Sequence, residues 1–218
     1  MGNWITSQRD GADEQAGKSR AAPANSGPPA NPGARTAPAA RSERIRERKA
    51  ARVLALQALF EIDSTGHAPD AVLYERLRVG QAGAPRLSAA ASPSAVPDAD
   101  ESDVLTALGL PAMLSDAGSD FLLWLVAGVM THRAPINGLI HTHAPEWPVD
   151  QLAIVDRNIL RLALFELGAA RSETPPKVVI DEAVELAKIF GSDSSPRFIN
   201  GVLGAALADA QAEQFGRE

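Results

Sequence analysis

The sequence predicts an all-α protein, and three observations carry this prediction. Apolar residues recur three and four positions apart along several segments, as they do in amphipathic helices. Glycine and proline, which favour helix ends, separate these segments with mostly short connections. No segment has the strict apolar–polar alternation of a half-buried strand. We therefore expect helices packed around a common core.

Composition limits the possible functions. The chain has 218 residues, enough for one domain or a small pair, and a formal net charge of −6 that argues against a general nucleic-acid binder. It has no cysteine, which excludes disulfides, thiol catalysis and zinc–thiolate sites. The longest apolar run, Phe121 to Met130, is too short to span a bilayer. Because no basic-then-apolar signal pattern is present, we expect a cytoplasmic protein without membrane contact.

The first predicted helix begins with positive charge. Residues 1–40 are rich in Ala, Pro, Gly and Ser, so we expect a disordered tail there. After it, two acidic residues stand among six basic ones: Arg41, Arg44, Arg46, Arg48, Lys49 and Arg52. The segment continues into an apolar helix whose remaining face would carry Arg46, Ala50, Gln57 and Glu61. From the residues alone, phosphate binding and a water-exposed turn with Arg–Glu pairs are equally supported.

In the middle of the chain, the residue pattern predicts three more helices and one insertion. A short helix over 70–79 follows Gly66 and Pro69, and residues 80–118 have the low complexity of a long mobile loop. Helices are then expected over 120–132 and 135–143.

The end of the helix expected over 135–143 carries two histidines and is followed by a tryptophan. His141 and His143 lie two positions apart, on different helix faces, without a strong third ligand, so we expect no metal site. Trp147 is expected to pack as an anchor over the junction between the two helical halves.

Three final helices have clearly marked ends. The first is expected from about Pro148 to Leu167, with Gly168 as its stop. The second should open after Thr174, with two prolines in its first turn, and end at Gly191. The third should open with Ser195 as N-cap and Pro196 at its first position. In this last helix, Gly201 and Gly204 are expected to permit close approach of a neighbouring helix.

No catalytic constellation is present in the sequence. There is no glycine-rich phosphate loop, nucleophile elbow or zinc-binding helix motif. The acidic run Asp181, Glu182 and Glu185 has the spacing of a water-exposed helix face, and Lys188 is placed to pair with Glu185. Arg157 and Arg161 are expected to pair internally, with Asp156 or Glu166. We expect neither an enzyme nor a cofactor site.

Three motifs resemble those of one known family. VDRNILRLALFEL, then P-x-K-V-V-I-D-E-A-V-E-L-A-K-x-F-G, then F-I-N-G-V-L stand in the order and at the spacing of the NusB family of bacterial transcription antitermination factors. The resemblance covers residues 120–206 and resumes upstream over 44–60. It implies a NusB-like fold of two packed three-helix bundles with a shared N-terminal helix. The domains would be 41–147, with the insertion, and 148–218.

The resemblance also implies a binding surface. In the family, the basic arm and the turn before the last helix face RNA. Carried over position by position, the expected RNA-binding residues are Arg48, Lys49, Arg52, Gln57, Phe60, Phe190, Asp193, Ser194 and Phe198. Phe190 is at least as readily interpreted as a core residue, and some relatives have a carboxylate where this chain has Ser194. Asp156 matches a carboxylate that faces the family's protein partner.

The implied function is transcription antitermination. The chain would bind single-stranded boxA RNA in ribosomal transcripts as a heterodimer with the small-subunit ribosomal protein NusE, and would join RNA polymerase with other Nus factors. An alternative is an accessory domain related to the N-terminal domain of ribosomal RNA cytosine methyltransferases; the chain itself lacks that enzyme's cofactor-binding unit and cysteine nucleophile. A third is a helical module that binds only proteins.

Overall fold

Helices make up nearly all of the ordered structure. The computed structural model describes residues 37–79, 101–170 and 172–216. Within these ranges the chain forms α-helices, and the sole β-type pairing there is an isolated bridge between Ala169 and Phe215. The all-α prediction is confirmed. The helices are α1 (Ala37–Thr65), α2 (Pro69–Val79), α3 (Glu101–Ala107), α4 (Asp116–Thr131), α5 (Arg133–His143), α6 (Ile154–Gly168), α7 (Pro176–Phe190) and α8 (Ser195–Glu213).

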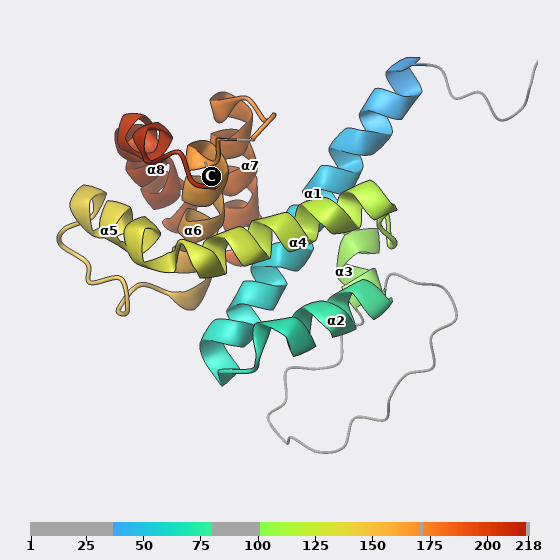
Figure 1. Ribbon diagram of the computed structural model, residues 1–218, viewed down its shortest axis with the longest axis horizontal. Helices are drawn as coiled ribbons and strands as arrows, with labels where there is room; N and C mark the ends of the chain where they lie inside the picture. The colour runs from blue at the N-terminus through green and yellow to red at the C-terminus, as the bar shows by residue number, and fades with distance from the viewer. Residues whose placement is uncertain (1–36, 80–100, 171, 217–218) are drawn as a thin grey trace, which may run out of the picture. The chain divides into compact units, whose positions relative to one another are not determined.

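Two helices, α1 and α6, form the centre of the core. Helix α4 crosses α1, while α6, α7 and α8 pack on one another to one side of it (Figure 1). Ten residues between Ala50 and Ile62 are buried, and α4 and α6 are the helices that pack most extensively on α1. Ala50 is fully buried too, so its expected place on an exposed face was wrong. Helix α6 is buried at every position from Asn158 to Gly168.

The start of α6 differs most from the predicted boundary. It begins at Ile154, six residues after the expected Pro148. Pro148 instead opens a turn closed by the hydrogen bond from the Gln151 N–H to the Pro148 carbonyl, 2.9 Å long. Ala153 then has an extended conformation with ψ of 136°, which sets the helix start one residue later.

The other boundaries lie closer to their predictions. Helix α4 begins at Asp116, four residues early, because the Ser115 side chain accepts a hydrogen bond from the Gly118 N–H. Ser194, not Ser195, occupies the N-cap position of α8. The Ser195 hydroxyl accepts instead from the Ser192 N–H at 2.9 Å, inside the turn.

The predicted insertion is only partly a loop. Residues 80–100 lie outside the described part of the chain, but 101–107 form α3 and its Leu105 is 2% exposed. The loop prediction was therefore wrong for 101–107. Of the predicted disordered tail 1–40, residues 1–36 lie outside the described part of the chain. Residues 37–40 belong to α1, so the prediction was wrong for them.

Close helix contacts occur at other glycines than the predicted pair. A methyl group at Gly201 or Gly204 would meet nothing within 4 Å, so the predicted close approach there was wrong. A methyl group at Gly128 of α4 would overlap the Phe165 ring of α6.

Residues 36–218 cluster as one unit, and the predicted division near residue 147 stays a prediction. Among the described helices, none combines the length and apolarity needed to cross a bilayer.

Candidate nucleic-acid interface

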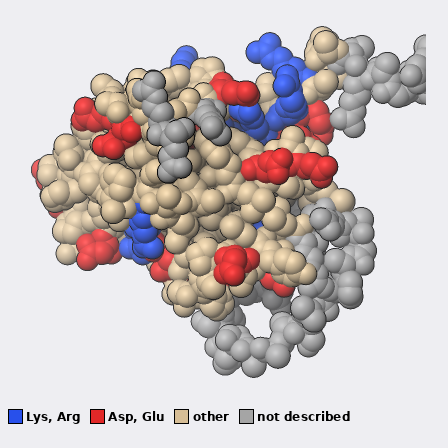
Figure 2. All heavy atoms as spheres, in the orientation of Figure 1, with Lys and Arg blue, Asp and Glu red and all other residues tan. Residues whose placement is uncertain are grey.

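The head of α1 presents two of the predicted RNA-binding cations at the surface. Arg48 donates through Nη1 to Thr174 Oγ1 and through Nη2 to Glu173 Oε2, each at 3.1 Å. Lys49 Nζ lies 3.2 Å from Glu182 Oε1 of α7. Both cationic side chains keep about two fifths of their surface in water, at 36% and 42%. Figure 2 shows basic side chains gathered over this end of α1, beside acidic ones.

A groove runs between this head and the start of α7. It encloses about 360 Å³ and is lined by Arg41, Arg44 and Arg48 of α1 and by Glu173 and Glu182 opposite. The Arg48–Glu173 pair across it contributes little to stability, because both side chains are solvated. Breaking this exposed pair to free the Arg48 guanidinium would therefore cost the fold little.

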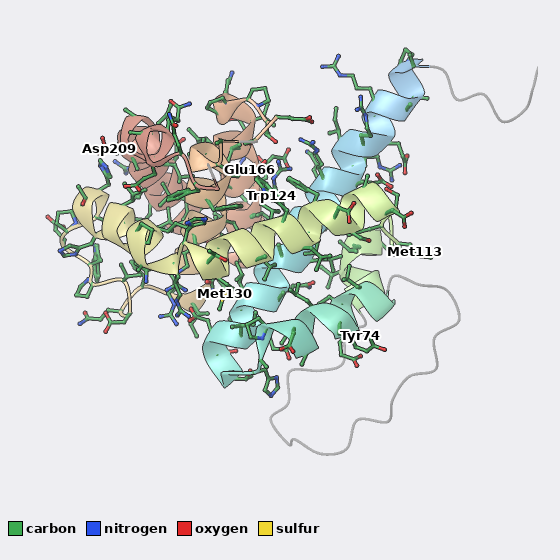
Figure 3. The ribbon with its side chains drawn as sticks, in the orientation of Figure 1. Tyr74, Met113, Trp124, Met130, Glu166 and Asp209 are labelled. Carbon is green, nitrogen blue, oxygen red and sulfur yellow. The ribbon has the colours of Figure 1, made fainter. Side chains whose placement is uncertain are left out.

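Arg52 has a different environment from its neighbours. Its guanidinium donates two hydrogen bonds to the Glu166 carboxylate, at 3.0 and 2.6 Å. The side chains are 7% and 2% exposed, and Arg52 also lies over the Phe121 ring, 5.2 Å from its centroid. Glu166 lies on α6 and is labelled in Figure 3. The expectation that Arg52 emerges with the basic arm was wrong, because α6 carries a buried carboxylate that takes both donors.

Further along α1, two predicted contact residues reach the surface to different extents. Phe60 is 41% exposed, which is unusual for a phenylalanine on a core helix. Gln57 is half-buried, and its Oε1 is buried without a hydrogen-bond partner among the described residues. Since that oxygen is closed to solvent, only the rest of the half-buried Gln57 side chain is open to a ligand.

The turn between α7 and α8 and the helix ends beside it carry the remaining predicted residues. Asp193 and Ser194 are exposed, whereas Phe190 and Phe198 are half-buried and pack against the core. Gly191 allows the turn to close tightly, because a methyl group there would lie 2.6 Å from the Ser195 Cβ. The two phenylalanines thus combine core packing with partial exposure.

The structure brings only part of the predicted site together. Lys49 of α1 reaches Glu182 of α7, so the basic head lies against the helix that leads to the Gly191–Phe198 turn. On that helix, a hydrogen bond from Lys188 and its charge hold the pKa of Glu185 below its usual value, and Lys49 adds to the effect. The predicted Glu185–Lys188 pair is confirmed at 2.6 Å. A single track from the head to the turn stays a prediction.

Sequence reasoning missed several residues of this surface. Glu173, Thr174 and Glu182 were not recognised as partners of the arm, because more than 120 positions separate Arg48 from the first two and no local pattern marks them. Trp147 was expected as a packed anchor, but it is 54% exposed, so that prediction was wrong. Its place in a polar connection between two prolines was the available signal.

Arg157 and Arg161 do pair internally, but with a different acid from the expected ones. Asp63 of α1 accepts from Arg157 Nε at 2.6 Å and from Arg161 Nη1 at 2.8 Å. Arg133 of α5 adds a third contact at 2.7 Å. Burial alone would raise the pKa of Asp63, but the hydrogen bonds and charges of Arg157 and Arg161 hold it below its usual value. This cluster links α1, α5 and α6.

The predicted partner contact, Asp156, and the histidine His143 both lie outside the basic arm. Asp156 lies half-buried in the first turn of α6, and its Oδ1 is buried with no hydrogen-bond partner in the part of the chain that the structure describes. His143 Nε2 lies 2.9 Å from Asp209 Oδ2 of α8. No group of three or more metal-ligating side chains occurs in the described part of the chain.

Comparison with solved structures gives the class of fold. NusB from T. maritima superposes with a TM-score of 0.55 at 24% identity, over 74% of this chain and 91% of that one. The solution structure of NusB from Aquifex aeolicus gives 0.51 at 25% identity, over 79% and 95%. A structure described as antitermination factors NusB and NusE in complex with dsRNA gives 0.54 at 24% identity, over 76% and 98%. The protein is therefore of the NusB-type helical class.

The sequence comparisons then identify the family. The NusB family model matches residues 49–208. A Chloroflexus aggregans relative is 41% identical over 173 residues, which are 79% of this chain and 94% of the relative. A Roseiflexus castenholzii relative is 40% identical over 74% of this chain and 92% of its own length. Both are named transcription antitermination protein NusB. The chain belongs to the NusB family.

Proposed function

We propose that this chain is a cytoplasmic, non-enzymatic transcription antitermination factor. It binds single-stranded boxA-type RNA of ribosomal transcripts together with the ribosomal protein NusE, and that complex joins RNA polymerase with other Nus factors. Family membership and the names of the relatives support this proposal. The observation that carries it furthest on this chain is the exposed pair Arg48 and Lys49, whose partner carboxylates lie across an open groove.

The RNA surface we propose extends from that groove to the last turn before α8. Arg48 and Lys49 bind phosphates, while Phe60 and Phe198 offer partly exposed rings for base stacking. Gln57 offers an amide to a base edge, and Asp193 and Ser194 add polar contacts. Phe190 supports the turn from the core side. Arg52 acts indirectly, because its pair with Glu166 fixes the segment of α1 that carries Arg48.

Asp156 is proposed as the contact to the ribosomal protein. Its carboxylate lies in the first turn of α6, at some distance along the chain from the RNA residues, and the side chain is half-buried. Asp156→Asn is expected to weaken capture of purified NusE and to leave the protein's thermal stability within a few degrees of the wild type.

The double variant Arg48→Ala/Lys49→Ala tests the RNA surface. Removing two phosphate-binding cations should weaken binding to boxA-type RNA, and should lower the slope of log affinity against log salt by about 0.7 to 1 per lost contact. Fluorescence anisotropy titrations at several salt concentrations measure both quantities.

A matched control removes equal charge elsewhere. Lys177→Ala/Lys188→Ala takes two cations from α7, on a different side from the groove residue Glu182. The control should keep the wild-type slope. Equal slopes in wild type and the Arg48/Lys49 variant would mean that this arm does not bind the RNA backbone.

The alternative, an accessory domain related to ribosomal RNA methyltransferases, has less support. The relatives described above carry the antitermination name, and the match spans 92–94% of their own length.

A further inference from the structure

A second groove lies beside the Gly191–Phe198 segment. It encloses about 510 Å³ between the α5–α6 connection and the first half of α8. Ser194 and Phe198, two of the proposed RNA contacts, line one wall. Trp147 of the α5–α6 connection lies on the other. This groove therefore continues the RNA surface proposed above, towards residues to which no role was assigned.

Trp147 is the feature of this groove that needs explaining. More than half of the side chain, 54%, is exposed to water. It is neither a core residue nor the packed anchor expected from the sequence. A large indole left in water forgoes the stabilisation that burial would bring, and an exposed aromatic beside a groove is a common platform for an unstacked base.

The charged groups of the groove also fit a nucleotide. Arg197 is exposed in the first turn of α8, where the helix dipole adds to its attraction for phosphate. Glu146, next to the tryptophan, is exposed in the same groove. Its carboxylate repels phosphate, but it can accept from the amino or imino groups of a base. The groove thus has a stacking face, a cation and a base-edge acceptor.

Contacts that do not involve the Trp147 ring hold the backbone around this groove. His143 at the end of α5 lies 2.9 Å from Asp209 of α8, labelled in Figure 3. The Ala144 N–H donates to the Ile140 carbonyl at 2.8 Å, and Ala144 is buried. Since neither contact involves the Trp147 ring, removing that ring should leave the backbone of the groove in place.

We propose that Trp147 stacks on one base of the bound single-stranded RNA, beyond the nucleotides held by the Gly191–Phe198 turn, with Arg197 on the adjoining phosphate and Glu146 on the base edge. This inference rests on the proposed function and extends its RNA track by a nucleotide site. A single strand suits an open groove, because its bases are free to leave the stack and enter between the two walls.

Titration of the full chain with a short boxA-type RNA, in the presence of purified NusE, tests this proposal. Trp147→Ala should weaken binding about 5- to 150-fold, the range expected for loss of one stacked base. The salt slope should stay at the wild-type value, because stacking neutralises no phosphate. Trp147→Phe should recover most of the affinity. Thermal unfolding followed by circular dichroism checks that all variants are folded.

RNA with single abasic positions identifies the stacked base. At one position, removal of the base should weaken binding to the wild type but cause no further loss with Trp147→Ala. Tyr74→Ala is the matched control, since Tyr74 is 63% exposed on α2 and lies far from α8 in Figure 3. It should bind like the wild type.

Each adverse outcome has a separate meaning. Wild-type affinity of Trp147→Ala, in a chain that binds RNA, overturns the stacking proposal alone. Failure of the wild type to bind RNA overturns both proposals. If Trp147→Ala weakens capture of NusE while RNA binding without NusE is unchanged, the groove holds a protein, and the proposal is wrong.

Discussion

Two arginines one helical turn apart show how burial decides the role of a residue. Arg48 and Arg52 both lie over the Phe121 ring, 4.9 and 5.2 Å from its centroid. Arg48 reaches partners at the surface, whereas Arg52 is enclosed with Glu166. The sequence predicted the same function for both, because a basic run carries no signal about a carboxylate 114 positions away. One is suited to bind a ligand and the other to hold the fold.

Their substitutions should therefore differ in unfolding free energy. Arg52→Ala leaves the Glu166 carboxylate buried and unpaired, and we expect a loss of roughly 3–5 kcal/mol. Arg48→Ala removes exposed interactions and should cost about 1 kcal/mol or less. Urea denaturation followed by circular dichroism measures both changes. Comparable losses for the two variants would show that the Arg52–Glu166 pair is not a buried structural pair.

At the scale of the element, α1 is tied to its neighbours through one acidic residue. Asp63, near its end, meets Arg157 and Arg161 of α6 and Arg133 of α5. Because the Asp63 side chain is 7% exposed, three cations compensate its burial. The helices themselves were predictable from local periodicity, but the partners of Arg157 and Arg161 were not, since they lie 94 and 98 positions away on another helix.

The Asp63 cluster should make stability depend on pH. The folded pKa of Asp63 is lowered, so its contribution is present above the unfolded pKa of about 3.9 and is lost as pH falls through the folded value. Asp63→Asn should cost roughly 3–5 kcal/mol near neutral pH. The difference in unfolding free energy between wild type and variant should shrink below about pH 4. A difference that stays constant in acid would contradict this assignment.

Alanine substitutions at glycines of two helices should change stability in opposite directions. Gly128→Ala places a methyl group on the Phe165 ring between α4 and α6, so the variant should lose stability despite better helix propensity. Gly204→Ala meets open space on α8 and should gain about 0.5–1 kcal/mol. Thermal melts of the two variants measure this contrast. Equal effects would show that α4 and α6 do not pack closely at Gly128.

At the scale of the whole molecule, local pattern predicted more of the fold than of the site. Helix existence followed from spacing and caps, and most boundaries were within a few residues. The start of α6 was missed because Pro148 opens a turn, and α3 was missed inside a low-complexity segment. The site depends on contacts between distant segments, such as Lys49 with Glu182, which no local pattern encodes.

We propose that the head of α1 and the Gly191–Phe198 segment bind the same RNA molecule. Ultraviolet crosslinking of the full chain to a short boxA-type RNA, followed by peptide mapping, tests this most directly. We expect RNA-linked peptides from both Arg48–Phe60 and Gly191–Phe198, and their joint loss in the Arg48→Ala/Lys49→Ala variant. Crosslinks confined to one of these segments, or to the face of α2, would contradict a shared RNA track.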